Sequence, residues 1–209
     1  MKIKVTTIAF LLLSWLKLLA QDANVIRSMI ESNALDELKS YIEKYPKSIN
    51  MDLVDGLTPL NYAVRENKID IVRFLLENKA NVNTADVVGL TPLHKSCQNG
   101  YDEIVQLLLN YPVKVNDAGM IGYTPLHYAS DICKPETIKL LISKGANVNA
   151  LGTLKETPLM FAARANRLDN VKILIEAGAD KNLQDEDGKT AHDYAKEKNH
   201  EEMVELLSK

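Results

Sequence analysis

The sequence predicts an all-α solenoid, in which helix–turn–helix units stack side by side. Two observations carry this prediction. A threonine recurs at every thirty-third position, and fixed positions after each threonine hold the same kind of residue. The threonines are Thr58, Thr91, Thr124, Thr157 and Thr190. Because one helix pair cannot bury its apolar face alone, several such units must stack to form a core.

Each threonine is expected to begin the first helix of its unit. Threonine is a good N-cap, and proline suits the first turn, where no backbone donor is needed. The first four threonines are followed by Pro59, Pro92, Pro125 and Pro158. Small residues come five positions after the threonines, where neighbouring helices must approach closely: Ala63, Ser96, Ala129, Ala162 and Ala195.

The second helix of each unit carries the rest of the predicted core. A leucine occupies the seventeenth position after each threonine, at Leu75, Leu108, Leu141, Leu174 and Leu207. Glycines mark the turns, and a positive φ is expected there. They are Gly56, Gly89, Gly122 and Gly188 before the threonines, and Gly145 and Gly178 after the second helices. Lys155 replaces the turn glycine in one unit, so we expect a different turn there, with Gly152 as the flexible residue.

The motif itself points to a family. The sequence reads T-P-L-H at Thr91–His94 and at Thr124–His127, and G-A-N-V-N at Gly145–Asn149. Together with the constant spacing of the threonines, this pattern closely resembles the ankyrin repeat over residues 53–209, and more weakly over 23–52. The resemblance implies an ankyrin-repeat solenoid with short β-hairpin fingers between the units. The expected divisions are a divergent N-terminal capping repeat at 21–54, repeats at 55–87, 88–120, 121–153 and 154–186, and a C-terminal capping repeat at 187–209.

Residues 1–20 have the layout of a secretory signal peptide. Lys2 and Lys4 precede an apolar run from Val5 to Leu16, and Ala20 offers a small residue for cleavage. Leu18 fits the cleavage rule poorly. The alternative is an uncleaved membrane anchor, but a spanning helix needs about 20 apolar residues. We therefore expect an exported protein, periplasmic or secreted; the lack of an N-x-S/T sequon favours a bacterial source.

The charge of the chain narrows the class of partner. Removal of residues 1–20 takes away three lysines and no acids, which moves the net charge from −3 to −6. Binding to phosphate backbones needs clustered lysine and arginine. We therefore expect a protein partner, with no nucleic acid and no membrane contact after signal cleavage, and we expect the chain to be a monomer.

No residue pattern indicates catalysis, a metal or a cofactor. The repeats account for nearly every residue after the signal, and no familiar catalytic motif is present. The resemblance implies that His94 and His127 hydrogen-bond the backbone, although a hydrolase that uses one of them is the rival from another class. Cys97 and Cys133 are expected to be free thiols, since neighbouring helices lie roughly 10 Å apart and a disulfide needs Cα atoms within about 7 Å.

The resemblance also implies where a partner binds, namely at the tips of the fingers and on the concave face of the first helices. The tips are apolar in four fingers and acidic in the last, at Glu186–Asp187. The apolar tips are Leu53, Val54, Val87, Val88, Met120, Ile121 and Leu154. Exposed apolar patches tend to mark interfaces. The first-helix candidates are Arg65, Gln98, Asp131 and Arg164.

An aromatic residue recurs four positions after most threonines, at Tyr62, Tyr128, Phe161 and Tyr194. Packing between helices is favoured over a binding platform there. The sequence therefore predicts a non-catalytic protein-binding module in an exported compartment. Two alternatives remain open, an accessory or immunity-type inhibitor of a periplasmic enzyme or toxin, and a membrane-anchored scaffold.

Overall fold

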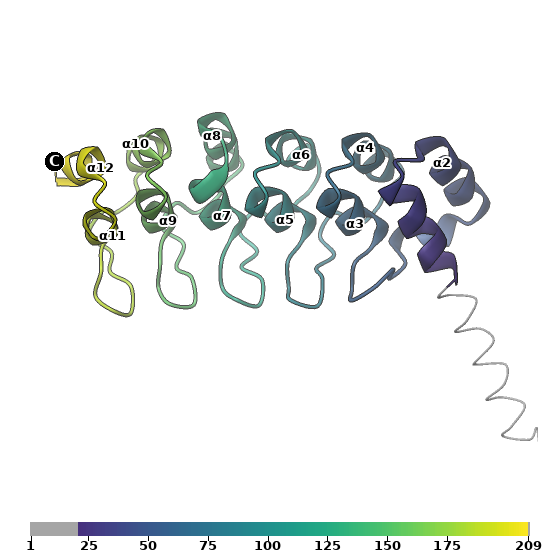
Figure 1. Ribbon diagram of the computed structural model, residues 1–209, viewed down its shortest axis with the longest axis horizontal. Helices are drawn as coiled ribbons and strands as arrows, with labels where there is room; N and C mark the ends of the chain where they lie inside the picture. The colour runs from purple at the N-terminus through teal and green to yellow at the C-terminus, as the bar shows by residue number, and fades with distance from the viewer. Residues whose placement is uncertain (1–20, 209) are drawn as a thin grey trace, which may run out of the picture. The chain divides into compact units, whose positions relative to one another are not determined.

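The computed structural model describes residues 21–208, which form helices joined by tight turns (Figure 1). The expected signal peptide lies outside these residues. The predicted all-α repeat fold is confirmed. Among the described residues the only β pairing is an isolated antiparallel bridge between Val54 and Leu57. The fingers are therefore hairpin-like turns rather than paired strands.

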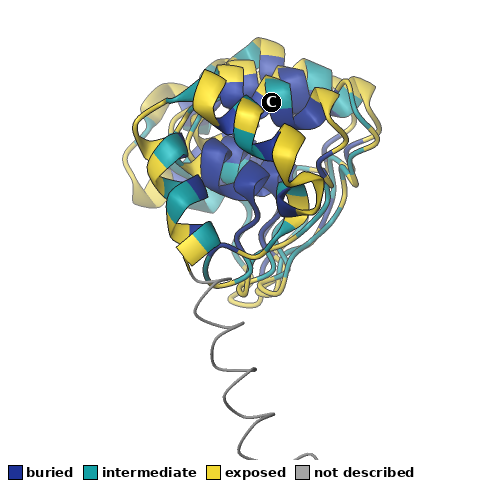
Figure 2. Cartoon of the chain, turned by 90° about the vertical axis from the view of Figure 1, so that its right-hand side faces the viewer, coloured by how far each residue is buried: buried dark blue, intermediate teal, exposed yellow. Residues whose placement is uncertain are grey.

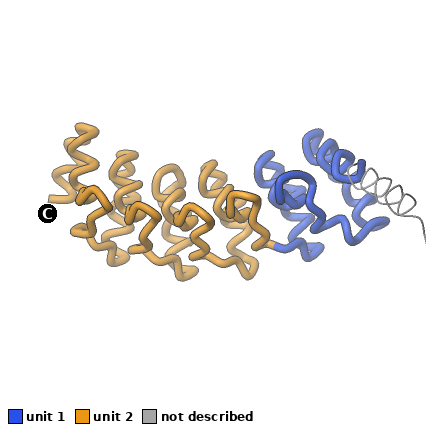
Figure 3. Tube along the Cα trace, turned by 90° about the horizontal axis from the view of Figure 1, so that it is seen from below, with its two compact units in different colours: residues 1–81 blue, residues 82–209 orange. Residues whose placement is uncertain are grey.

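The chain divides into two compact units, residues 1–81 and residues 82–209 (Figure 3). In unit 1, residues 21–31 are helical. They are followed by α2 (Leu35–Lys44), the 3₁₀ helix η1 (Pro46–Asn50), α3 (Pro59–Arg65) and α4 (Ile69–Glu77). Helix α3 packs against α4 and η1, and α2 packs against η1 and α4.

Unit 2 contains four helix pairs arranged in two layers. The first-helix layer contains α5 (Pro92–Gln98), α7 (Pro125–Ile132), α9 (Pro158–Arg164) and α11 (Ala191–Glu197). The second-helix layer contains α6 (Asp102–Leu108), α8 (Pro135–Ser143), α10 (Leu168–Glu176) and α12 (Glu201–Ser208). Each first helix contacts the next first helix as well as its own partner (Figure 1). The fingers of unit 2 extend from the first-helix layer, on the side away from the second helices.

The core lies between the two helices of each pair, where the repeated leucines and small residues meet. All five leucines of the second helices are buried, as are the small residues at the close approach of the first helices. Figure 2 shows the buried residues gathered in the helices and the exposed residues at the ends of the turns. The repeated positions in the sequence are therefore core positions, and the finger tips are free to vary.

The turns show why glycine recurs before the threonines. Gly89, Gly122 and Gly188 have φ values of 78°, 77° and 76°, as predicted. The expectation for Lys155 was wrong. Lys155 itself adopts the left-handed conformation, at φ 59°, and Gly152 does not. Gly152 is required for another reason, because the ring of Tyr123 lies where a Cβ atom would be.

Regularly spaced asparagines join neighbouring repeats through hydrogen bonds to the backbone. In unit 2, Asn116 Nδ2 donates to Gly145 O at 2.8 Å, and its Oδ1 accepts from Asn147 N–H at 2.8 Å. Asn83 and Asn149 make the equivalent pair of bonds one repeat earlier and one repeat later. These side chains thus connect the backbones of successive repeats.

Candidate functional site

The candidate surface of unit 2 is built from four fingers, which we name A (residues 84–90), B (117–123), C (150–156) and D (183–189). In finger A, the Asp86 carboxylate accepts the N–H groups of Val88 and Leu90 at 3.0 and 2.9 Å. Asp185 does the same in finger D for Asp187 and Lys189. An aspartate five positions before the threonine therefore shapes both turns, and this spacing is a sequence signal for them.

The tips of fingers A, B and C expose apolar side chains to solvent. Met120 is 75% exposed, the largest exposed fraction among the exposed large hydrophobic residues. Leu151 in finger C is exposed too, although the sequence analysis did not select it. The set is named the apolar fingertip surface and consists of Val87, Val88, Met120, Ile121, Leu151 and Leu154.

The finger of unit 1 differs from this pattern. Leu53 is only 6% exposed, so the prediction that it forms part of an exposed tip was wrong. Its N–H donates to Leu57 O at 2.9 Å, so Leu53 lies at the base of the finger rather than at its tip. Val54 is half-buried. The exposed apolar row is therefore a feature of unit 2.

Contacts between neighbouring fingers make the surface continuous. Gly89 in finger A lies against the backbone of Met120 in finger B, so closely that a Cβ atom would collide with it. Thr153 Oγ1 in finger C donates to Ile121 O in finger B at 2.6 Å. Glu186 N–H in finger D donates to Leu154 O at 3.0 Å. Each finger thus supports the next one, and the tips are held in a fixed order.

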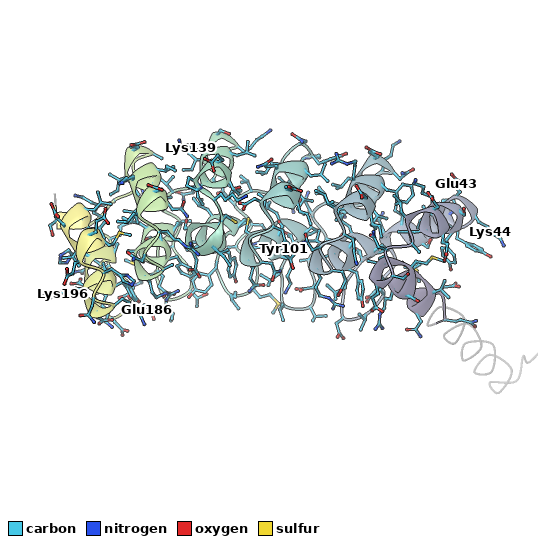
Figure 4. All side chains as sticks on the ribbon, turned by 45° about the horizontal axis from the view of Figure 1, so that its top comes forward. Glu43, Lys44, Tyr101, Lys139, Glu186 and Lys196 are labelled. Atoms are coloured by element: carbon cyan, nitrogen blue, oxygen red, sulfur yellow. The ribbon has the colours of Figure 1, made fainter. Side chains whose placement is uncertain are left out.

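The surface changes character at finger D, where the tip is acidic. Glu186 and Asp187 are both exposed, and neither forms a salt bridge with another described residue. Figure 4 shows Glu186 near the last finger, and Lys139 of α8 on the opposite edge of unit 2. A small cleft of about 90 Å³ lies between fingers C and D, and Tyr194 and Leu154 form part of its wall.

The predicted first-helix positions have different environments. Arg65 is exposed; its guanidinium lies 4.1 Å from the centre of the Tyr62 ring and its Nε donates to Glu66. Arg164 is half-buried and lies 3.2 Å from Glu156 Oε1 and 4.7 Å from the Phe161 ring. Gln98 and Asp131 are exposed. Arg164 is thus partly engaged in holding finger C, while the other three are accessible.

Of the four recurring aromatic residues, Tyr62 and Phe161 are buried, and Tyr128 and Tyr194 are half-buried. Phe161 is buried and contacts the rings of Tyr123 and His127, with centroids 5.2 and 5.4 Å away. Tyr123 in turn donates to Glu156, and burial together with that bond raises the pKa of Tyr123 to about 12. This network fixes the bases of fingers B and C, which favours the packing interpretation.

His94 and His127 are completely buried and hydrogen-bonded on both ring nitrogens. Thr91 N–H donates to His94 Nδ1 at 3.2 Å, so the Nε2–H donates to Asp117 O at 2.8 Å. His127 repeats this arrangement with Thr124 N and Glu156 O. Burial lowers the pKa of both histidines, which keeps the rings neutral. Each histidine therefore joins the start of its own helix to the finger of the next repeat, and both bond the backbone as the resemblance implied.

Cys97 and Cys133 are both buried and unpaired in this structure. The Cys133 thiol lies 3.6 Å from Cys97 O and donates to it. Burial raises the pKa of the Cys97 thiol, which favours the unreactive protonated form. Residues 21–208 contain no group of three histidine, cysteine or acidic side chains placed to hold a metal ion.

One helix–helix turn departs from the others and was not predicted. Asn67, Gly100 and Asn166 each end a first helix with a positive φ. Cys133 occupies the same position after α7 but is extended, at φ −73° and ψ 162°. The next repeat supplies donors for the carbonyls at this turn: Asn170 Nδ2 donates to Ser130 O and Cys133 O at 3.2 and 3.1 Å.

The family assignment follows from these repeated features and from sequence comparison. A family model described as ankyrin repeats (3 copies) matches residues 26–118, 85–152 and 126–209. The chain belongs to the ankyrin-repeat family. Ankyrin repeats are protein–protein interaction modules and are typically non-catalytic. No curated protein matched this sequence. Within residues 21–208, none of the ankyrin helices has the length and apolar character needed to cross a membrane.

Proposed function

We propose that this ankyrin-repeat protein binds a protein partner through the apolar fingertip surface and neighbouring first-helix residues, in an exported compartment, without catalysing a reaction. The observation that carries this proposal is the exposed apolar row on fingers A to C. A water-exposed apolar surface is costly for a solitary protein and gains free energy when a partner covers it. Export rests on the pattern of residues 1–20 alone.

The buried histidines support a binding role over the rival hydrolase. A general base must reach a substrate proton, but both rings are enclosed and both nitrogens are occupied. The same groups have a clear structural task in shaping the fingers.

The test is a cross-linking pull-down from the exported fraction, with the wild type and the double variant Val88→Asp plus Ile121→Asp as baits. Both residues are exposed, so the variant is expected to fold normally and to lose the partner. The control is Ile132→Asp, which places a single added carboxylate on an exposed apolar residue of α7 outside the fingers. Equal capture by wild type and the double variant would reject the fingertip interface.

Localisation has its own test. N-terminal sequencing of the protein from the exported fraction should find a chain that starts at Gln21. A chain that retains residues 1–20 and sediments with membranes would favour the anchored scaffold instead. An inhibitor role predicts that the captured partner is an enzyme or toxin whose activity falls when the wild-type protein is added.

A further inference from the structure

The apolar fingertip surface has a direction, because only one of its ends is acidic. Fingers A, B and C present apolar tips, and finger D presents Glu186 and Asp187. The bond from Glu186 N–H to Leu154 O joins this acidic tip directly to the apolar row. A partner that covers the row therefore meets negative charge at a fixed place.

The negative charge at this end is only partly compensated, because neither Glu186 nor Asp187 forms a salt bridge with another described residue. Arg164 is paired with Glu156, and Lys189 Nζ lies 2.8 Å from Glu197 Oε1, although the charge of Lys189 also interacts with Asp185 and Asp187. Lys155 in finger C is exposed and forms no ion pair with Glu186 or Asp187 among the described residues. Like charge opposite this end would be repelled, and opposite charge would be attracted.

The wall of the cleft between fingers C and D suits a long basic side chain. Leu154 and Tyr194 offer apolar and aromatic surface, and the exposed carboxylates of Glu186 and Asp187 lie beside them, whereas Glu156 and Asp185 are buried and already paired within the protein. Lysine and arginine combine an apolar stem with a charged end, so they can lie along such a wall and place the charge at the acids. Burial opposes ionisation of Asp185, but hydrogen bonds from Tyr194 and from backbone N–H groups outweigh it and lower the pKa, which keeps the carboxylate ionised.

We infer that the partner presents to unit 2 an apolar strip that ends in a lysine or arginine, with the basic end at finger D. This statement rests on the proposed function and adds the chemistry and the orientation of the partner. Neighbouring helices pack roughly 10 Å apart, so fingers A to D span about 30 Å. That length corresponds to about nine extended residues or about 20 helical residues.

The experiment uses a displayed library of random peptides of about 20 residues, selected on the immobilised full chain. Enriched peptides are expected to combine apolar residues with lysine or arginine placed towards one end. Their affinities are then measured by fluorescence anisotropy against three variants. These are Glu186→Lys plus Asp187→Lys, Val88→Asp plus Ile121→Asp, and the control Glu201→Lys plus Glu202→Lys.

The charge reversal in finger D should weaken binding about tenfold or more. The control reverses two exposed acids of α12, outside the fingers, and should change the affinity less than about twofold. Equal effects of the two charge reversals would overturn the inference, because the preference would then reflect net charge alone. Enrichment without excess basic residues, enrichment of no peptide, or self-association that occupies the fingers would also overturn it.

The outcomes separate this inference from the proposed function. If the apolar-to-aspartate variant loses the peptides while the finger D reversal does not, the fingertip interface stands and the basic end is wrong. If the apolar-to-aspartate variant binds like the wild type, the fingertip interface itself is wrong. Circular dichroism and thermal unfolding of each variant establish that the fold is intact in every comparison.

Discussion

His94 and His127 show how much structure one side chain of the repeat controls. Each ring accepts the N–H of a capping threonine and donates to a carbonyl in the next finger, at Asp117 and Glu156. Both bonds require the neutral ring, with Nδ1 as acceptor and Nε2 as donor. Protonation would destroy the first bond and place a charge in the core.

This requirement predicts a pH dependence of stability. Burial lowers the pKa of both histidines below the ordinary value of 6.5, so the unfolded chain takes up protons that the folded chain does not. The free energy of unfolding should therefore be fully retained above pH 6.5 and fall as the pH drops below it. Urea unfolding at a series of pH values measures this. The His94→Gln plus His127→Gln variant should be less stable at neutral pH and show a shallower slope; an unchanged slope would contradict the assignment.

Lys155 and Gly122 offer a paired test of turn strain. Both occupy the left-handed region, at φ 59° and 77°, but only one is a glycine. Lys155→Gly should raise the free energy of unfolding by about 1 kcal/mol, because a side chain is unfavourable there. Gly122→Ala should lower it by at least about 1 kcal/mol, since a Cβ atom would also press on Thr153. Thermal unfolding of both variants measures the two signs, and a loss of stability in Lys155→Gly would contradict the first.

The thiols can be followed through the folding transition. Cys97 and Cys133 are buried, and the pKa of Cys97 is raised by burial. A thiol reagent should therefore modify neither cysteine in the folded protein and both after unfolding in urea. Mass measurement under non-reducing conditions checks the prediction of free thiols, because a disulfide would reduce the mass by two hydrogens.

At the scale of the element, the turn between α7 and α8 departs from the repeat. Without a left-handed residue at Cys133, the carbonyls at the end of α7 need donors from elsewhere. Asn170 supplies two bonds, and Arg167 Nε donates to Asp131 O at 2.6 Å. The altered turn also leaves Ile132 exposed beside a groove of about 380 Å³.

Asn170→Ala should therefore destabilise the protein by about 1–3 kcal/mol, because it leaves buried carbonyls without a donor. Lys172→Ala is the matched control on the exposed face of α10 and should change stability by no more than about 0.5 kcal/mol. Urea unfolding monitored by circular dichroism gives both values. Equal values for the two variants would show that the bonds of Asn170 contribute nothing.

For the whole molecule, the constant period of the sequence was sufficient to predict the fold, because every repeated residue has a local or nearest-neighbour task. The buried leucines, the threonine caps and the turn glycines could all be read from their spacing. The finger tips could be predicted only in part. The burial of Leu53 and the exposure of Leu151 depend on how each finger folds back on its base, and no repeated spacing encodes that.

The repeat core has a further test at this scale. Leu108 is completely buried between α6 and its neighbours in unit 2. Leu108→Ala should cost about 2–5 kcal/mol through a cavity that the stacked helices cannot close. Urea unfolding measures the change, and a cost below about 1 kcal/mol would show that the position is more loosely packed than the structure indicates.

The unusual turn after α7 also bears on how such a gene can change. Repeat proteins grow and shrink when single units are duplicated or deleted, which works where each unit carries its own helix ends. The repeat at 121–153 does not, because Asn170 and Arg167 of the next repeat bond the carbonyls at the end of its first helix. We expect these two units to be gained or lost together, so recombination within the stack should fall on either side of the pair.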